Sequence, residues 1–317
     1  YIEGSWQNFK IQPFQDLSLS PACTTLHYGQ TIFEGLKAYR NQEGEILIFR
    51  PDKNAERFNK SAERMCMPKI PEDIFIKSIE ELLSVEKAWV PEGEKNSLYI
   101  RPISFALDPY IGIKPADNYK FMIICGMAGG YYSEPVNVKI ETHYTRAVSG
   151  GVGFSKTAAN YAAALYPAVE AQKDGYHQLI WTDGKSHEFV EESGTMNLFF
   201  VINNQLVTPP LGDTVLDGVT RDSIIHLSKL LNIDVDVRKV SVKEVISSLE
   251  SGSMSEAFGA GTAATIAPIK SIGYNNKKYN LPEISEKSIS NTLLNKLSNI
   301  KFGRELTELN WLKKISK

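Results

Sequence analysis

The stretch that decides the fold is Ser149-Gly-Gly-Val-Gly-Phe-Ser-Lys-Thr-Ala-Ala-Asn-Tyr161, in which Lys156 follows a glycine-rich bend and precedes a predicted helix. A predicted strand and turn separate it from a second stretch, Glu191-Glu-Ser-Gly-Thr-Met-Asn197. Together the two stretches supply a lysine amine, a phenol and a carboxylate. These are the groups that pyridoxal phosphate needs: an amine for a Schiff base, a hydrogen-bond partner for the ring oxygen, and an anion for the ring nitrogen.

The segments around these stretches alternate between strand and helix patterns, which is typical of a mixed α/β protein. A hairpin is predicted to turn at Asn203-Asn204, a helix to begin near Thr220, and Asp52 to cap the first long helix. The charged segment 287–317 is expected to form an amphipathic helical cover that faces solvent. Strands are predicted at 45–50, 98–106, 120–128, 136–142 and 178–183, with a strand-rich stretch at 253–273, and helices at 52–65, 71–89 and 160–173.

The length of 317 residues is sufficient for about two domains. The best candidate for a linker is the glycine-rich segment that begins at Gly129 and ends at Pro135, because glycine and proline interrupt regular structure. The sequence therefore predicts a smaller N-terminal α/β domain at 1–131, a linker at 132–136, and a larger C-terminal domain at 137–317 that binds the cofactor.

The composition excludes several classes of partner. Hydrophobic residues make up 42% and charged residues 23% of the chain, which is typical of a soluble globular protein. The net charge of −2 does not indicate binding to nucleic acid or to an anionic membrane. No apolar run approaches the ~18 residues of a membrane-spanning helix.

Cysteine and histidine usage predicts a cytoplasmic protein without a metal site. Cys23, Cys66 and Cys125 are odd in number and lie in apolar surroundings, so we expect buried thiols in a reducing compartment. The five histidines show no ligand spacing, and the sequence predicts no bound metal.

In spacing and residue identity, these stretches resemble the branched-chain amino acid aminotransferases, which are class IV pyridoxal-phosphate enzymes. The resemblance covers nearly the whole chain. It is carried, besides the two stretches above, by His27–Ala38 (His-Tyr-Gly-Gln-Thr-Ile-Phe-Glu-Gly-Leu-Lys-Ala), Phe49-Arg50-Pro51 with Arg57, Leu98–Pro102, and Gly259–Ala264.

The resemblance implies a fold-type IV enzyme with two α/β domains and the cofactor in the cleft between them. It implies transfer of the amino group of L-leucine, L-isoleucine or L-valine to 2-oxoglutarate through a Lys156 Schiff base and a pyridoxamine phosphate intermediate. The partners implied are small amino acids and 2-oxo acids, together with a second copy of the chain in a homodimer.

The resemblance also assigns the residues that hold pyridoxal phosphate. Glu192 matches the family's Glu-x-Gly-Thr-Met-Asn pattern and pairs with the ring nitrogen, whereas its rival Glu191 is expected to face solvent. The phosphate is assigned to Arg57 and to the backbone at Val219 and Thr220, where a helix begins, with Arg146 as a second candidate for the charge. The cofactor-binding set is Arg57, Lys156, Tyr161, Glu192, Thr195, Val219, Thr220 and Thr262.

The substrate residues follow from the same resemblance. Backbone groups at Thr262 and Ala263 hold the α-carboxylate, and Tyr28, Phe33 and Tyr99 line the side-chain pocket. Arg101 meets the γ-carboxylate when glutamate replaces leucine in that pocket. The remaining two residues, Ile111 and Ile113, reach the active site of the partner subunit.

Two other reactions share this lysine and glutamate, because D-amino acid aminotransferases and aminodeoxychorismate lyase have the same fold. The run from Tyr28 to Tyr39 and the Thr-Met-Asn that ends at Asn197 favour the branched-chain transferase. A binding protein without catalytic activity would be expected to lack Lys156, Glu192 or Arg57, and all three are present.

Overall fold

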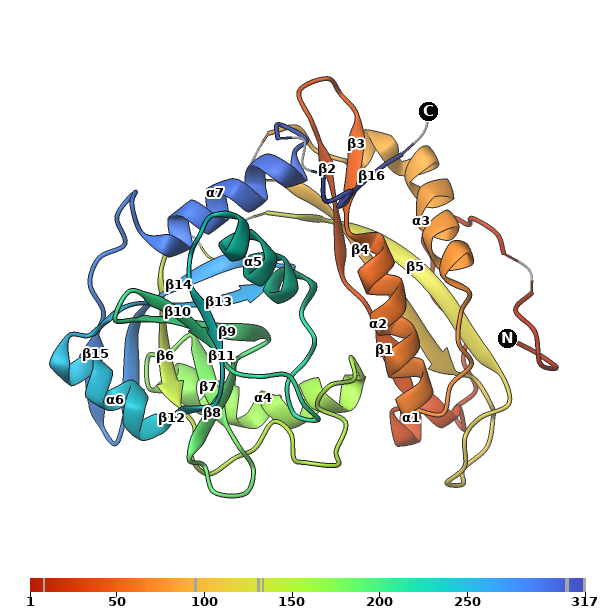
Figure 1. The fold of residues 1–317 in the computed structure, drawn as a ribbon. Coiled ribbons are helices and arrows are strands. Elements are labelled where there is room, and N and C mark those ends of the chain that lie inside the picture. The colour runs from red at the N-terminus through yellow and green to blue at the C-terminus, as the bar shows by residue number, and fades with distance from the viewer. Residues whose placement is uncertain (8, 94–95, 130–131, 133, 306–307, 316–317) are drawn as a thin grey trace. The chain divides into compact units, whose positions relative to one another are not determined.

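A computed structural model describes residues 1–7, 9–93, 96–129, 132, 134–305 and 308–315 (Figure 1). The chain divides into two compact units. Unit 1 comprises Tyr1–Gly129, Ser155–Ala159 and Ile300–Lys317, and unit 2 comprises Gly130–Phe154 and Asn160–Asn299. The expected mixed α/β class is confirmed. The expected domain boundaries at 131 and 137 stay a prediction, and the two units differ from them in the segments 155–159 and 300–317.

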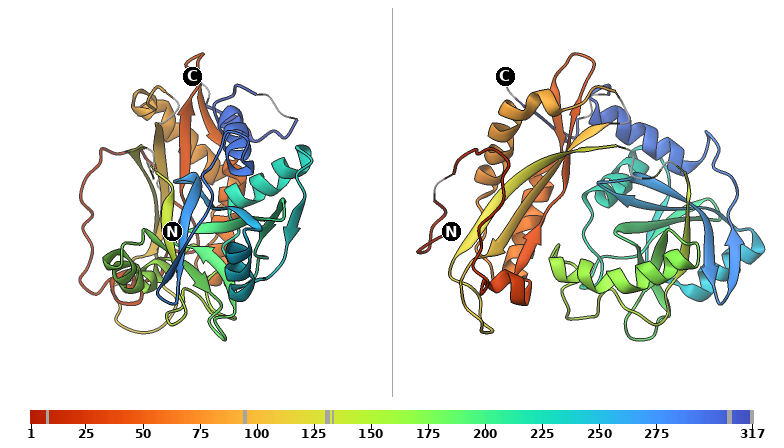
Figure 2. Two further views of the ribbon diagram at one scale, coloured as in Figure 1. Left: turned by 90° about the vertical axis from the view of Figure 1, so that its left-hand side faces the viewer. Right: turned by 180° about the vertical axis from the view of Figure 1, so that it is seen from behind.

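Unit 1 is built on an antiparallel sheet. Among the described residues it has six strands, with β4 at its centre: β5 pairs along one edge of β4, and β1 and β2 share the other edge. β3 pairs with β2, and β16 completes that side of the sheet. Figure 2 shows the long β4–β5 pair from behind. The strands are β1 (Thr31–Phe33), β2 (Leu36–Arg40), β3 (Ile46–Phe49), β4 (Ser97–Ala106), β5 (Tyr119–Ala128) and β16 (Leu312–Lys314).

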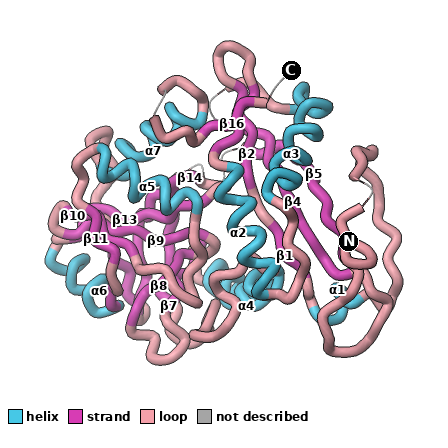
Figure 3. Tube along the Cα trace, turned by 45° about the vertical axis from the view of Figure 1, so that its right-hand side comes forward, coloured by secondary structure: helices cyan, strands magenta, loops and turns pink. Residues whose placement is uncertain are grey.

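Two helices cover one face of this sheet, α2 (Pro51–Arg64) and α3 (Glu72–Glu86) (Figure 3). Ala55, Phe58 and Ala62 of α2 pack in one core with alternate residues of the strands, because both patterns place their apolar side chains on one side. The expected cap is wrong in one detail. Arg50, with φ 49°, is the N-cap of α2, Pro51 follows it, and Asp52 lies inside the first turn. The remaining helices of the unit are α1 (Thr24–Tyr28) and the 3₁₀ turn η1 (Lys87–Trp89).

Unit 2 contains a mixed sheet of ten strands among the described residues. The path from β9 through β13, β14, β6, β7 and β8 returns to β9, because β8 and β9 also pair with each other. The sheet therefore closes into a ring around an apolar core. Its strands are β6 (Val136–Ile140), β7 (Gln178–Thr182), β8 (Phe189–Ser193), β9 (Met196–Ile202), β10 (Gln205–Thr208), β11 (Val235–Val237), β12 (Val240–Ser241), β13 (Met254–Gly261), β14 (Thr265–Tyr274) and β15 (Lys277–Asn280).

Local sequence explains how unit 2 forms. Every residue of β9 is buried, and its residues from Leu198 to Ile202 form a continuous apolar run. The expected hairpin is confirmed: Asn203 and Asn204 have φ of 51° and 63°, the left-handed values of a tight turn between β9 and β10. Ser241 caps α6 by accepting from the N–H of Glu244 at 3.0 Å. The long helices are α4 (Ala158–Lys173), α5 (Val219–Leu230), α6 (Val242–Ser251) and α7 (Ile289–Lys301).

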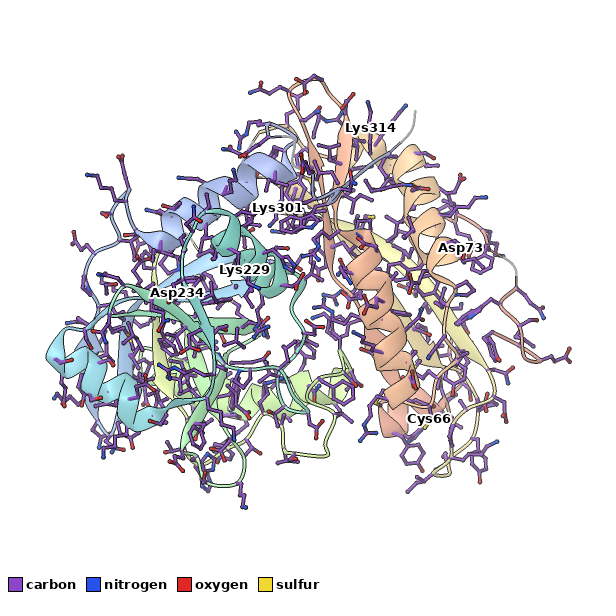
Figure 4. The ribbon with its side chains drawn as sticks, viewed as in Figure 1. Cys66, Asp73, Lys229, Asp234, Lys301 and Lys314 are labelled. Atoms are coloured by element: carbon purple, nitrogen blue, oxygen red, sulfur yellow. The ribbon has the colours of Figure 1, made fainter. Side chains whose placement is uncertain are left out.

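The expectation for segment 287–317 is wrong in part. It forms the amphipathic helix α7, but Leu293 and Leu297 are completely buried, and the last two residues of the helix belong to unit 1. The chain then adds β16 to the edge of β3. Lys301, labelled in Figure 4 at the end of α7, is only 4% exposed and has its Nζ 5.3 Å from the centroid of the Phe49 ring.

Burial of Lys301 predicts a pH-dependent effect on stability. Desolvation, with a smaller contribution from the charge of Lys37, lowers the pKa of Lys301 to about 7. The unfolded chain keeps a lysine pKa of about 10.4. Between these values the unfolded state binds more protons than the folded state, so the stability of the wild type rises with pH. Below pH 7 the full cost of the buried charge is present. We expect Lys301→Met to raise Tm at pH 7, by a stability gain on the order of a few kcal/mol.

Thermal unfolding at pH 7, 8.5 and 10 checks this prediction. The advantage of Lys301→Met should shrink steadily toward pH 10, because the folded state is already neutral there and the pH approaches the pKa of the lysine in the unfolded chain. The matched control is Lys314→Met, because Lys314 is an exposed lysine of β16 with 60% of its side chain accessible (Figure 4). A difference in Tm that did not depend on pH would contradict the prediction.

Candidate active site

Lys156 lies in unit 1, in the short segment that precedes α4, and its backbone is held on both sides. Its N–H donates to Ser61 Oγ at 2.9 Å, and its carbonyl accepts from the N–H of Phe33 at 3.0 Å. The next residue, Thr157, forms a β-bridge with Ile32. Since the main chain is fixed, the side chain is the part of Lys156 that can move. Its Nζ lies 4.9 Å from the centroid of the Phe33 ring.

A buried carboxylate lies close to this lysine. Glu34, at the bend between β1 and β2, is 0% exposed. Arg57 donates to it from Nε at 2.7 Å and from Nη2 at 2.8 Å, and Asn54 Nδ2 donates at 2.7 Å. Burial by itself would raise the pKa of Glu34. The charge and hydrogen bond of Arg57, aided by the charge of Lys156, hold the pKa below its ordinary value.

Phe33, Tyr99 and Arg101 form an aromatic–cationic group in the same unit. The Arg101 guanidinium lies 4.5 Å from the centroid of the Phe33 ring and 5.2 Å from that of Tyr99, and its Nη2 donates to the Tyr99 hydroxyl at 2.9 Å. Arg101 Nε is buried and has no hydrogen-bond partner among the described residues. This arrangement gives an apolar wall with one polar, positively charged group, as ligand pockets require. Since Phe33 also contacts Lys156, three of the expected substrate residues and the lysine belong to one group.

The structure does not bring the other expected residues of unit 1 into this group. Tyr28, at the end of α1, is 42% exposed and has its ring 6.2 Å from that of His27. Ile111 and Ile113, in the loop after β4, are 65% and 93% exposed.

In unit 2, Glu192 is a buried carboxylate on β8, 3% exposed. Arg146 Nη2 lies 2.6 Å from its Oε2. Asn197 Nδ2 and the N–H of Leu216 donate to its Oε1 at 3.0 and 2.9 Å. These donors compensate a negative charge that would otherwise be costly to bury. The site therefore holds an anion in a fixed orientation.

The surroundings of Glu192 change two expectations. Arg146, the second candidate for the phosphate, instead pairs with Glu192 and donates from Nη2 to the carbonyls of Gly153 and Thr214. Glu191 is half-buried and does not face solvent, because the Thr214 hydroxyl donates to it at 2.6 Å. Desolvation raises the pKa of Glu191, although Thr214 and Arg146 oppose the rise.

The start of α5 has the geometry of an anion-binding site. Gly218 is its N-cap, and among the described residues no side chain caps the helix. A Cβ at Gly218 would collide with Asn197 Oδ1, so the close packing there requires glycine. Val219 and Thr220 open the first turn and are buried. Their backbone N–H groups and the positive end of the helix dipole favour a negative group at this position.

The remaining expected residues lie elsewhere in unit 2. Thr262 and Ala263 form the tight turn between β13 and β14, where Gly261 pairs with Thr265. Tyr161 lies on α4 and is partly buried, and Thr195 is an exposed residue of the turn between β8 and β9.

Sequence reasoning missed three residues that hold the lysine and its neighbours, namely Glu34, Asn54 and Ser61. A usable signal was present in α2. Asn54, Arg57 and Ser61 follow one another at spacings of three and four, which places them on one face of the helix. Polar residues on a buried helix face indicate a polar network rather than a solvated surface.

The described residues contain neither a membrane-spanning helix nor a metal-binding group. None of the helices there has the length and apolar character needed to cross a membrane. Likewise, in that part of the chain, no group of three histidine, cysteine or acidic residues is arranged to bind a metal ion. The three cysteines form no disulfide. Of these residues, all expected to be buried, Cys23 is buried, Cys125 is partly buried and Cys66 is exposed.

Residues 31–272 match the family model described as amino-transferase class IV. Branched-chain-amino-acid transaminase 1 of Bacillus subtilis is 41% identical, and the similarity covers 98% of this chain and 89% of the relative. The branched-chain-amino-acid aminotransferase of Mycobacterium tuberculosis is 36% identical, over 99% of this chain and 88% of its own. The chain is thus similar to these enzymes along nearly its whole length.

Solved structures give a consistent result. The branched-chain aminotransferase of the archaeon Thermoproteus uzoniensis, crystallised with norvaline, has a TM-score of 0.79 at 26% identity and covers 94% of each chain. The branched-chain amino acid aminotransferase of Thermobaculum terrenum, in its PLP form, has a TM-score of 0.77 at 23% identity. That similarity covers 95% of this chain and 94% of the other. The second likeness supports the fold alone.

Proposed function

The chain belongs to the class IV aminotransferase family, and from this premise we propose that it moves the amino group of L-leucine, L-isoleucine or L-valine to 2-oxoglutarate. The products are a branched-chain 2-oxo acid and L-glutamate. The observation that carries the proposal is the 41% identity with the Bacillus subtilis transaminase over 98% of the chain. Fold alone would not suffice, because one fold supports several reactions.

The residues present fit pyridoxal 5′-phosphate. Lys156 supplies a mobile amine, Glu192 an oriented buried anion, and the uncapped start of α5 a set of donors for a phosphate. When bound, the cofactor supplies an electron sink for the carbanion that the amino acid forms on losing its Cα proton. The other assignments are Arg57 and Thr262 toward the phosphate, Tyr161 toward the ring oxygen, and Thr195 as a further contact of the cofactor.

Lys156 has two tasks in this proposal. Its Nζ binds the cofactor before substrate arrives. Once the substrate has displaced it, the free amine of Lys156 moves the proton from the substrate Cα. The hydrogen bond that the Lys156 N–H donates to Ser61 and the one its carbonyl accepts from Phe33 hold the lysine backbone during both tasks, so that only the side chain changes position. Because the backbone of Lys156 is held in place, its flexible side chain keeps the amine within reach of the substrate Cα.

Glu192 acts on the ring nitrogen. Its carboxylate keeps a proton on that nitrogen, and the bonds from Arg146, Asn197 and the Leu216 N–H stop the carboxylate from turning away. This is electrostatic preorganisation, because the negative group is already in place before charge develops on the substrate.

Arg101 gives the pocket its dual specificity. Beside Phe33 and Tyr99 it presents apolar rings to leucine and a guanidinium to the γ-carboxylate of glutamate. Arg101→Met keeps the bulk and removes the charge. A hydrogen bond to a charged group is worth ~1.5–3 kcal/mol. In Arg101→Met, kcat/KM for glutamate and 2-oxoglutarate should therefore fall about ten- to a hundredfold, while kcat/KM for leucine should change only a few-fold.

Single-turnover absorbance measurements, made once with leucine and once with glutamate as the amino donor, separate the two half-reactions of Arg101→Met. Tyr99→Phe serves as the matched control, because it removes the hydroxyl that Arg101 contacts and leaves the guanidinium in place. Equal losses for leucine and glutamate would mean that Arg101 only supports β4.

Steady-state rates for a panel of L-amino acids, each with 2-oxoglutarate as acceptor, test the proposed function itself. We expect leucine, isoleucine and valine to exceed the other amino acids of the panel, from which glutamate is left out because its reaction with 2-oxoglutarate regenerates the same pair. D-alanine should give no measurable rate, and a preference for D-amino acids would contradict the proposal.

We further propose a homodimer in the cytoplasm. The exposed Ile111 and Ile113 support the dimer, in which they would reach the active site of the partner. The three cysteines, none of which forms a disulfide, suit a reducing compartment.

A further inference from the structure

Glu34 has no part in the assignments above, yet it contacts a residue that does. It makes a two-point ion pair with Arg57, whose side chain is 8% exposed while that of Glu34 is completely buried. A buried pair of this kind seldom stabilises a fold more than apolar residues of similar size. Stability therefore does not account for the pair, and a role in the site must be considered.

The face of α2 that holds Glu34 also holds Lys156. Asn54 and Arg57 donate to the Glu34 carboxylate. One turn further, Ser61 Oγ donates to the carbonyl of Arg57 at 3.0 Å and accepts from the Lys156 N–H. A single helix face thus fixes the carboxylate, the guanidinium and the lysine backbone relative to one another.

The two contacts set the direction of the Arg57 guanidinium. A guanidinium has five N–H donors in one rigid plane, so fixing Nε and Nη2 with Glu34 fixes where the remaining donors point. The N–H of Gly35 also donates to Glu34 Oε2 at 3.1 Å, and Asn54 donates to the same oxygen. The carboxylate itself therefore cannot rotate, and Arg57 cannot change orientation without breaking its two bonds to a carboxylate that is held in place.

We propose that Glu34 is a positioning residue that holds the Arg57 guanidinium in the orientation that binds the cofactor phosphate. The inference rests on the proposed function, in which Arg57 contacts that phosphate. Glu34 acts through Arg57 and touches neither cofactor nor substrate. Its removal should weaken recognition of the phosphate specifically, rather than binding of the pyridine ring.

Pyridoxal, which lacks the phosphate, provides the discriminating probe. In Glu34→Gln the amide NH₂ faces a donor of Arg57, so the two-point pair is lost although the shape is kept. Equilibrium dialysis should give a Kd for pyridoxal phosphate raised about ten- to a hundredfold, and a Kd for pyridoxal within about twofold of the wild type. The matched control is Glu56→Gln, which removes an exposed carboxylate from α2, the helix that carries Arg57, and should change neither Kd.

An equal rise in both Kd values of Glu34→Gln, or an unchanged Kd for pyridoxal phosphate, would overturn the inference. If Glu34→Gln does not fold, Asn54→Ala removes one bond to Glu34 and keeps the ion pair. Asn54→Ala should raise the Kd for pyridoxal phosphate a few-fold and leave the Kd for pyridoxal unchanged. Any other pattern counts against the inference. A wild type that bound pyridoxal phosphate no better than pyridoxal would instead overturn the assignment of the phosphate contacts in the proposed function.

Discussion

Replacing Lys156 with alanine is expected to lower turnover by at least about 10³-fold, because one amine both binds the cofactor and moves the Cα proton. The fold should survive. The backbone bonds of Lys156 to Ser61 and Phe33 do not involve its side chain, so Tm should change little. Loss of turnover with an intact fold is the signature of a residue that acts in the chemical step.

Borohydride reduction followed by peptide mapping locates the attachment. In the wild type the cofactor should be found on Lys156, and in Lys156→Ala no lysine should be labelled. The control is Lys173→Ala, which removes an exposed lysine paired with Glu170 at the far end of α4 and should leave turnover unchanged. Label on another lysine of the wild type would refute the site assignment.

Glu192→Gln has the second largest expected effect, and it acts on both turnover and stability. The amide keeps the shape but cannot hold a proton on the ring nitrogen, so kcat should fall about ten- to a hundredfold. Arg146, whose side chain is only 10% exposed, loses the charge that compensates it. Breaking a buried ion pair from one side costs about 3–5 kcal/mol, so Tm should fall clearly.

Two variants separate these effects. Glu192→Gln combined with Arg146→Met removes both charges, and should recover much of the lost Tm without recovering kcat. Glu191→Gln is the neighbouring control. Burial already raises the pKa of Glu191, so a neutral amide there should leave Tm unchanged or higher and kcat nearly unchanged. Recovery of kcat in the double variant would mean that Glu192 only supports the fold.

Much of the fold follows from local sequence. β9 is readable as a buried strand because Leu198 to Ile202 form an apolar run, and the Asn203-Asn204 turn follows from the left-handed conformation that asparagine tolerates. The start of α5 is equally readable, because a glycine precedes a helix pattern at Gly218. These elements depend on neighbours within a few residues.

The misplaced residues depend on contacts between distant segments. Lys301 belongs to a charged, amphipathic pattern that normally faces solvent, yet it packs against Phe49 of a strand far away in the sequence. Arg146 lies in a loop and forms an ion pair with Glu192. The course of that loop cannot be predicted from the hydrophobic periodicity of the sequence. Glu34 sits in a recognised motif, but its pairing with Arg57 becomes visible only when β1, β2 and α2 are packed together.

The most direct test of the central claim is the transfer of isotope from L-[¹⁵N]leucine to 2-oxoglutarate by the purified protein with pyridoxal phosphate. An aminotransferase of branched-chain substrates should yield ¹⁵N-glutamate and 4-methyl-2-oxopentanoate in equal amounts, and the yield should vanish with Lys156→Ala. Free ¹⁵N-ammonia without labelled glutamate would contradict the account. So would the absence of any transfer from leucine while aminodeoxychorismate is cleaved into pyruvate and an aromatic amine.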